Sequence, residues 1–137
     1  MNVLVIEPMK KPYMKEIDEG LKSLQSEVDG SIEVVYPFED EEVGLICNEE
    51  GKLNGMPLNR ALYDETGEMY DILAGKFLVV GLSGDSFCSL TPEQQEKFTK
   101  MYEKPEIFMR FGNSIKAIKV EADERADKVR MNDFMER

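Results

Sequence analysis

Two short apolar segments constrain the fold more than any other feature of the sequence. They read VGLIC at residues 43–47 and FLVVGL at residues 77–82, and a polar, turn-rich stretch separates them. Runs of this length that are apolar throughout, rather than alternating, are typical of strands buried on both faces of a sheet. We therefore expect residues 36–81 to form the centre of the molecule.

Further strands are predicted on either side of these two. The expected strands are residues 2–6, 31–36, 69–73, 108–111 and 115–120, the last two forming a hairpin across Gly112 and Asn113. Residues 57–62 fit either a strand or a single helical turn. Turns are expected at Gly51, with a positive φ, at Asn54–Gly55 and at Gly67.

Helical signals occur in three places. Ile17, Leu21, Leu24 and Val28 recur at helical spacing between Pro12 and Gly30, which predicts an amphipathic helix lying on the sheet. Thr91, Pro92 and Gln94 predict a helix start with an N-cap, a first-turn proline and a capping-box partner. Ala122, Ala126, Val129 and Phe134 share one face of an expected terminal helix.

Together these elements predict a single α+β domain. The chain of 137 residues is long enough for one hydrophobic core. We expect a mixed or antiparallel sheet of about five to six strands, two helices packed on it and a C-terminal helix. Residues 1–120 would be the α+β domain with its acidic loops, and residues 121–137 the helix.

The charge of the chain excludes several classes of partner. Seventeen basic against twenty-eight acidic side chains give a net charge of -11, and residues 23–51 carry nine acids with no Lys or Arg. Direct binding to nucleic acid or to an anionic membrane is not expected, because both depend on neutralising phosphates. A basic protein surface is the partner that this charge favours. The sequence lacks a long apolar segment, so we expect a cytoplasmic location.

The chain offers little for catalysis. It contains no His, which removes the commonest general base and the usual partner of a nucleophilic Ser or Cys. Cys47 and Cys88 have no metal-ligand spacing and are expected to be reduced thiols in the core. We assign no catalytic residue, metal or cofactor, and we favour a binding protein over an enzyme.

Eight carboxylates form the candidate partner-binding set: Glu39, Asp40, Glu41, Glu42, Glu49, Glu50, Asp64 and Glu65. Carboxylates gathered on one face can imitate phosphates and occupy an Arg-rich nucleic-acid channel. Two other interpretations stay open: a solvated loop, and a Mg²⁺ or Ca²⁺ site supporting phosphodiester cleavage, although no DxDxDG-type loop is present. Loop geometry decides whether residues 39–42 and 49–50 converge or lie at opposite ends.

A second candidate site is polar rather than charged. It comprises Asn48, Asn54, Asn59 and Arg60. Asn is also a common turn residue, because its side chain bonds to nearby backbone and it tolerates left-handed geometry. A structural role for these residues is therefore the competing interpretation.

Four segments carry a resemblance to a known family: YPFEDE, ICNEEGKLNGMPLNRAL, YDILAGKFLVVG and FCSLTPEQ. They resemble small proteins with a domain of unknown function that are common in conjugative and phage-like mobile elements of Gram-positive bacteria. The resemblance covers about residues 1–120. Some proteins with this kind of domain look similar to anti-CRISPR inhibitors of type II-A Cas9, which prevent guide RNA loading or cause guide truncation.

The resemblance implies that the chain shields a mobile element from host defence. It would bind the basic, guide RNA-binding surface of Cas9 through its acidic residues and block guide assembly. The alternatives are metal-dependent or Cas9-assisted truncation of the guide RNA, and a regulatory role in the mobile element without any defence function. The apolar cluster of Met131, Phe134 and Met135 adds a homodimer through the C-terminal helix to the expected partners.

Overall fold

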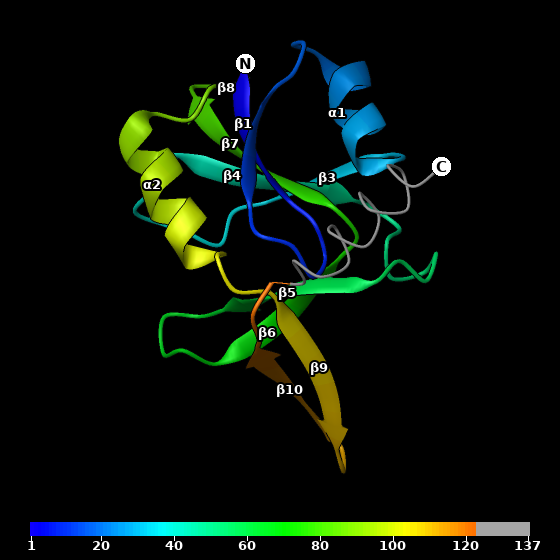
Figure 1. Ribbon diagram of the computed structural model, residues 1–137. Helices are drawn as coiled ribbons and strands as arrows, with labels where there is room; N and C mark the ends of the chain where they lie inside the picture. The colour runs from blue at the N-terminus through cyan, green and yellow to red at the C-terminus, as the bar shows by residue number, and fades with distance from the viewer. Residues whose placement is uncertain (123–137) are drawn as a thin grey trace, which may run out of the picture.

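A six-stranded antiparallel sheet forms the centre of the molecule in a computed structural model that describes residues 1–122 (Figure 1). The strands run in the order β2 (Tyr13–Glu16), β1 (Asn2–Ile6), β7 (Phe77–Ser83), β4 (Val43–Asn48) and β3 (Ile32–Val35), and β8 (Ser86–Cys88) pairs with the end of β7. The two apolar runs are confirmed as neighbouring central strands, because β4 and β7 pair directly.

Apolar side chains are buried on both faces of this sheet. One face packs under helix α1 (Leu21–Val28), and its core residues are Val3, Val5, Ile17, Leu24, Val28, Ile46, Leu78 and Val80. The other face packs against helix α2 (Pro92–Met101), with a core that includes Leu4, Ile6, Leu45, Phe77, Val79 and Phe98. The sheet therefore lies between the two helices (Figure 1), which explains why its central strands are apolar throughout.

A second layer lies on the α2 side of the sheet. Strands β5 (Leu58–Tyr63) and β6 (Met69–Ala74) form an antiparallel pair, and Leu62 and Leu73 from this pair join the core. The strand alternative for residues 57–62 is thus the one observed. The predicted hairpin is also confirmed, as β9 (Glu106–Phe111) and β10 (Ser114–Lys119), and it projects away from the body below β5 and β6 (Figure 1).

The first predicted helix was too long. Only Leu21–Val28 is helical, and Tyr13–Glu16 is instead the edge strand β2, paired with β1. Gly20, with a φ of 106°, precedes the helix and separates the two elements. Ile17 is buried as expected, but its place in the core comes from the segment between β2 and α1.

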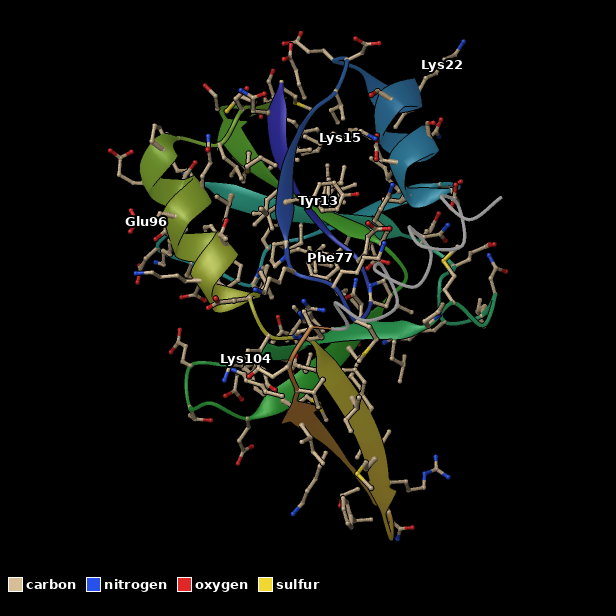
Figure 2. All side chains as sticks on the ribbon, in the orientation of Figure 1. Tyr13, Lys15, Lys22, Phe77, Glu96 and Lys104 are labelled. Atoms are coloured by element: carbon tan, nitrogen blue, oxygen red, sulfur yellow. The ribbon has the colours of Figure 1, made fainter. Side chains whose placement is uncertain are left out.

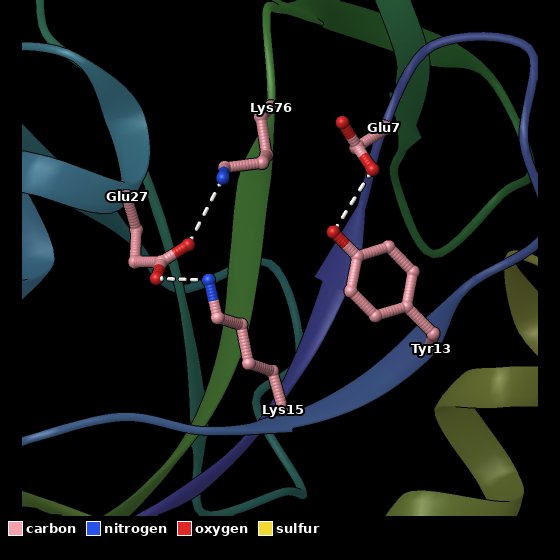
Figure 3. Close-up of polar contacts among 5 residues, drawn as sticks. All are labelled: Glu7, Tyr13, Lys15, Glu27 and Lys76. Atoms are coloured by element: carbon pink, nitrogen blue, oxygen red, sulfur yellow. Dashed lines mark hydrogen bonds and ion pairs between the residues drawn. The ribbon is translucent and has the colours of Figure 1, made fainter. Parts of the chain in front are cut away.

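Ion pairs tie α1 to the sheet. The Glu27 carboxylate of α1 accepts hydrogen bonds from Lys15 of β2 at 2.7 Å and from Lys76, just before β7, at 2.9 Å (Figure 3). Burial raises the pKa of Glu27, but these hydrogen bonds and the charges of both ammonium groups outweigh it and lower the pKa overall. On the same edge strand, the Tyr13 hydroxyl donates to Glu7, and burial together with this bond raises the pKa of Tyr13 to about 12.

The turn after β4 differs in detail from the prediction. Gly51 does not have a positive φ; it is required because a Cβ there would lie 2.8 Å from the carbonyl oxygen of Ala74. The positive φ in this turn belongs to Gly55, at 70°. The turn at Gly67 is confirmed, with a φ of 84°.

The predicted fold class is confirmed as α+β, with antiparallel sheets and two helices within residues 1–122. The strands of this part are divided among the central sheet and two separate pairs, β5–β6 and β9–β10, rather than joined in one sheet. The C-terminal helix expected in residues 121–137, and the homodimer proposed through it, lie outside the described residues, apart from its first two positions.

Candidate partner-binding site

An open cleft brings together acidic and aromatic side chains from two distant parts of the chain. The acidic cleft, as it is called below, is lined by Tyr36, Pro37, Glu39, Asp40, Tyr63, Asp64, Glu65, Thr66 and Tyr70, and its volume is about 710 Å³. Four of its lining residues are carboxylates and three are tyrosines. No Lys or Arg of residues 1–122 lines it.

The fold explains why these residues meet. Glu39 and Asp40 lie in the loop between β3 and β4, whereas Asp64 and Glu65 lie in the turn between β5 and β6. Since β5 and β6 pack on the same sheet through Leu62 and Leu73, their turn reaches the loop that leads into β4. This packing brings together two acidic pairs that lie about twenty-five residues apart in the sequence.

The β5–β6 turn is held in shape by Asp64. Its Oδ1 accepts hydrogen bonds from the Thr66 hydroxyl at 2.6 Å, from the Thr66 backbone N–H at 2.9 Å and from the Glu68 N–H at 3.0 Å. The hydrogen bond from the Thr66 hydroxyl, followed by those from the backbone, lowers the pKa of Asp64. Asp64 is therefore ionised throughout the neutral range and contributes a fixed negative charge to the cleft.

The tyrosines provide flat apolar faces beside the carboxylates. Tyr36 is 61% exposed and Tyr70 is 55% exposed, so both rings are accessible to a partner. Tyr63 is anchored, because its hydroxyl donates to Glu106 at 3.0 Å. Burial and the charge of Glu106 raise the pKa of Tyr63 to about 12, which keeps this phenol neutral.

The remaining predicted carboxylates lie elsewhere. Glu41 does not line the cleft and forms an ion pair with Lys97 of α2. Glu42 is exposed at the start of β4, where its carbonyl accepts from the Leu82 N–H at 2.9 Å. Glu49 and Glu50 follow the other end of β4, about 20 Å from Glu42 at the usual rise of a strand. Residues 39–42 and 49–50 therefore lie at opposite ends of one strand.

The four residues of the predicted polar site are not gathered in one place. Asn48 is buried, donates to the carbonyls of Val28 and Asp29 at the end of α1, and accepts from the Glu50 N–H. Asn54 is exposed in the turn after β4. Only Asn59 and Arg60 lie together, and both are almost fully buried.

Asn59 and Arg60 form a buried hydrogen-bond network at the junction of the layers. Asn59 donates to the carbonyls of Ile6 and Gly75, and its own Oδ1 accepts from Arg60 at 2.8 Å. The Arg60 guanidinium also donates to the carbonyls of Lys10 and Tyr102. Burial lowers the pKa of Arg60, while the charge of Glu106 opposes that shift.

Sequence reasoning missed the aromatic half of the cleft and the role of Glu106. Each of the three cleft tyrosines, Tyr36, Tyr63 and Tyr70, is near a predicted acid or turn in the sequence. That they lie together in space depends on how the layers pack, which the sequence alone does not show. Glu106 is buried and accepts from the Ala61 N–H at 2.9 Å and from Tyr63, so it joins β9 to β5. A lone acid after Pro105 carried no signal of this contact.

The side chains of the cleft are of types that can bind cations. Carboxylates beside tyrosine rings bind Arg and Lys through charge-assisted hydrogen bonds and through contact of the cation with the ring face. Within residues 1–122, no three His, Cys, Asp or Glu side chains are arranged to hold a metal ion. The helices in that range are all too short or too polar to span a membrane. Cys47 is buried and free, Cys88 is half-buried and free, and burial raises the pKa of Cys47 to about 11.

The fold and the cleft define a small acidic α+β domain whose open cleft is lined by carboxylates and tyrosines. Residues 1–103 match the model of a family described as a domain of unknown function, DUF3846, and the chain belongs to that family. The match ends before the hairpin, short of the 120 residues over which the resemblance was expected. No match was found among curated proteins or among solved structures.

Proposed function

We propose that this protein inhibits a nucleic acid-binding protein by occupying its basic surface with the acidic cleft. The observation that carries the proposal is the gathering of Glu39, Asp40, Asp64 and Glu65 with three tyrosines in one cleft that no Lys or Arg of residues 1–122 lines. Aromatic residues at the centre of a contact, paired with arginines, are typical of the residues that dominate binding energy.

The partner we propose is type II-A Cas9 before it has loaded its guide RNA, in the cytoplasm of a bacterial host. Support comes from the resemblance of the sequence to proteins of mobile elements and from the net charge of -11. A protein of this charge is attracted at long range to a surface built to hold RNA. Binding there would block guide assembly without any chemical step.

The four carboxylates of the cleft replace the larger set of eight as the proposed contact. Glu41 is already paired with Lys97, and Glu49 and Glu50 are at the other end of β4. A single basic surface can contact the cleft without reaching Glu49 and Glu50. We therefore assign partner contact to the cleft end of β4 and not to the end that carries Glu49 and Glu50.

The experiment that tests this function is a pull-down of Cas9 with and without bound guide RNA. We expect this protein to retain Cas9 that lacks a guide and to lose it when the guide is loaded first. Retention should weaken steeply between about 50 and 300 mM salt, because exposed charge pairs are screened over that range. Equal retention of both Cas9 forms would contradict the proposal.

A variant pair makes the pull-down specific to the cleft. Tyr36→Ala removes an exposed ring from the cleft, whereas Leu53→Ala removes an exposed apolar side chain, 86% accessible, near the opposite end of β4. We expect Tyr36→Ala to weaken retention by about ten-fold and Leu53→Ala to leave it unchanged.

The same reactions distinguish binding from guide truncation. The RNA recovered after incubation should keep its full length at any ratio of this protein to Cas9. Shortened guide at substoichiometric protein, abolished by EDTA, would instead indicate a metal-dependent cleavage. An unchanged guide without any retention of Cas9 would favour a regulatory role in the mobile element.

A further inference from the structure

The β9–β10 hairpin has an apolar face that nothing in residues 1–122 covers. Residues paired across an antiparallel hairpin lie on the same face. The outer face of this hairpin comprises the pairs Ile107–Ile118, Met109–Lys116 and Phe111–Ser114. Its four apolar side chains are each 38–49% exposed. A two-stranded hairpin is marginally stable in water unless it packs against another element, so this face would gain from a partner that covers it.

The hairpin is also basic, although the chain as a whole has a net charge of -11. Its basic residues are Arg110, Lys116 and Lys119. Its one acid, Glu106, is buried at the base. Near the tip, Arg110 and Lys116 are exposed, and the Lys116 ammonium lies 5.4 Å from the centre of the Phe111 ring. Neither cation has an acidic partner among residues 1–122. The tip therefore presents two cations beside an aromatic ring.

The acidic cleft has the complementary composition. Its carboxylates are those of Glu39, Asp40, Asp64 and Glu65, beside three tyrosine rings. No Lys or Arg of residues 1–122 forms an ion pair with any of these four. No hairpin residue lines the cleft, and the hairpin projects away from the body (Figure 1), so a chain does not fill its own cleft. The cleft volume of about 710 Å³ suits a drug-sized ligand, and therefore the side chains of a hairpin tip rather than a whole hairpin.

We propose that the hairpin tip of one copy of this protein docks into the acidic cleft of a second copy. Phe111 packs against the tyrosine rings, and Arg110 and Lys116 pair with the cleft carboxylates. Charge complementarity selects a second copy as the partner, because one chain carries both the basic, aromatic tip and the acidic, tyrosine-lined cleft. The hairpin lies beyond residue 103, where the family match ends, so the family match does not cover this contact.

The contact joins two different surfaces, so it is heterologous and can continue from copy to copy. It also occupies the cleft against Cas9, a consequence that rests on the proposed function. The self-association itself does not rest on that function, because it requires only the hairpin and the cleft.

Sedimentation equilibrium of the full chain alone measures the association. We expect the apparent mass to exceed that of one chain above a protein concentration of roughly 10⁻⁴ M, since the contact is small and two acidic copies repel each other at long range. The mass of a single chain at every concentration up to about 1 mM overturns the proposal. The measurement involves no Cas9, so its failure is distinct from a failure of the proposed function.

Charge reversals on each side identify the two surfaces. The tip variant is Arg110→Glu/Lys116→Glu, and the cleft variant is Glu39→Lys/Asp40→Lys. All four positions are exposed, so the fold should be preserved, which circular dichroism checks. Either variant alone should self-associate at least about ten-fold more weakly than the wild type. A cleft variant that associates as strongly as the wild type would place the contact between two hairpins and overturns the proposal, as does an unchanged tip variant.

Mixing the two variants should restore association, because the unaltered tip of one then meets the unaltered cleft of the other. Calorimetric titration of one into the other should give a dissociation constant within about five-fold of the wild-type value. A mixture that does not associate overturns the proposal.

Lys22→Glu/Lys100→Glu is the matched control for the tip variant. It changes the net charge equally, at exposed lysines on α1 and α2. Lys22 lies at the end of the molecule opposite the hairpin (Figure 2). We expect this control to change self-association by less than about three-fold, because it alters only the long-range repulsion. A loss as large as that of the tip variant would show that net charge, and not the tip, determines association, and would overturn the proposal.

Discussion

At the scale of single residues, two buried side chains connect the layers of this protein. Asn59 and Arg60 donate to the carbonyls of four residues in three segments: Ile6 and Lys10 near the start of the chain, Gly75 before β7, and Tyr102 after α2. A buried guanidinium is costly unless its donors are satisfied, and here carbonyl oxygens satisfy most of them. The apparent motif of the sequence is therefore a structural junction.

Asn59→Ala should lower the free energy of unfolding by about 2–4 kcal/mol. The change removes the side-chain donor to the carbonyls of Ile6 and Gly75 and the 2.8 Å acceptor of one Arg60 nitrogen, all in a buried setting. Urea denaturation followed by circular dichroism measures the loss. Asn54→Ala is the control, since Asn54 is exposed, and it should change stability by less than about 0.5 kcal/mol. Equal effects of the two changes would contradict a structural role for Asn59.

Glu27→Gln should lower the free energy of unfolding by about 1 kcal/mol at pH 7, because two partly exposed ion pairs are lost. The pKa of Glu27 is lowered in the folded state, so its contribution is present above the unfolded value near 4.5 and disappears as the pH falls through the folded value. The stability difference between wild type and variant should therefore shrink below about pH 4.5. Glu16→Gln, at an exposed site on β2, should show no such difference.

At the scale of elements, local signals were sufficient for α2 and insufficient for β2. In α2 the Thr91 hydroxyl accepts from the Gln94 N–H and the Gln94 side chain accepts from the Thr91 N–H, as the sequence predicted. Those contacts span three residues and depend on nothing distant. All four residues of β2 are exposed, so the strand has no apolar pattern to reveal it, and only pairing with β1 makes it a strand.

The candidate site was predictable only in part for the same reason. The acidic residues could be identified from the sequence, but which of them lie together in the folded protein could not. The loop before β4 and the turn after β5 meet because Leu62 and Leu73 pack on the sheet, a contact between layers. The pattern of apolar and polar residues along a strand does not predict which face of the sheet a second pair of strands will cover.

Thr91→Ala should lower the free energy of unfolding by about 1 kcal/mol, the usual loss for a helix N-cap. The cost arises because the Gln94 N–H loses its acceptor and the capping box is broken. Thermal unfolding measures it, with Thr99→Ala as the control, because Thr99 is within α2 and Ala favours a helix there. A destabilisation by Thr99→Ala as large as that by Thr91→Ala would show that capping is not the cause.

At the scale of the whole molecule, two groups of carboxylates lie at opposite ends of β4. The acidic cleft lies at one end of β4, and Glu49 and Glu50 lie at the other end, beside a separate hollow that also contains Lys52. In the proposed function, the net charge of -11 would attract a basic partner toward either end. We propose the cleft as the contact because it also contains tyrosine rings.

The most direct test compares two double charge reversals that alter the net charge equally. Glu39→Lys/Asp40→Lys reverses two cleft carboxylates, and Glu49→Lys/Glu50→Lys reverses two exposed carboxylates at the opposite end of β4. The affinity of each for guide-free Cas9 is measured calorimetrically at about 100 mM salt. The cleft double variant should lose at least about a hundred-fold in affinity. The control should lose less than about five-fold, because only the long-range electrostatic attraction is weakened. Equal losses would mean that net charge alone drives binding, and an intact affinity in the cleft variant would contradict the assignment of the cleft.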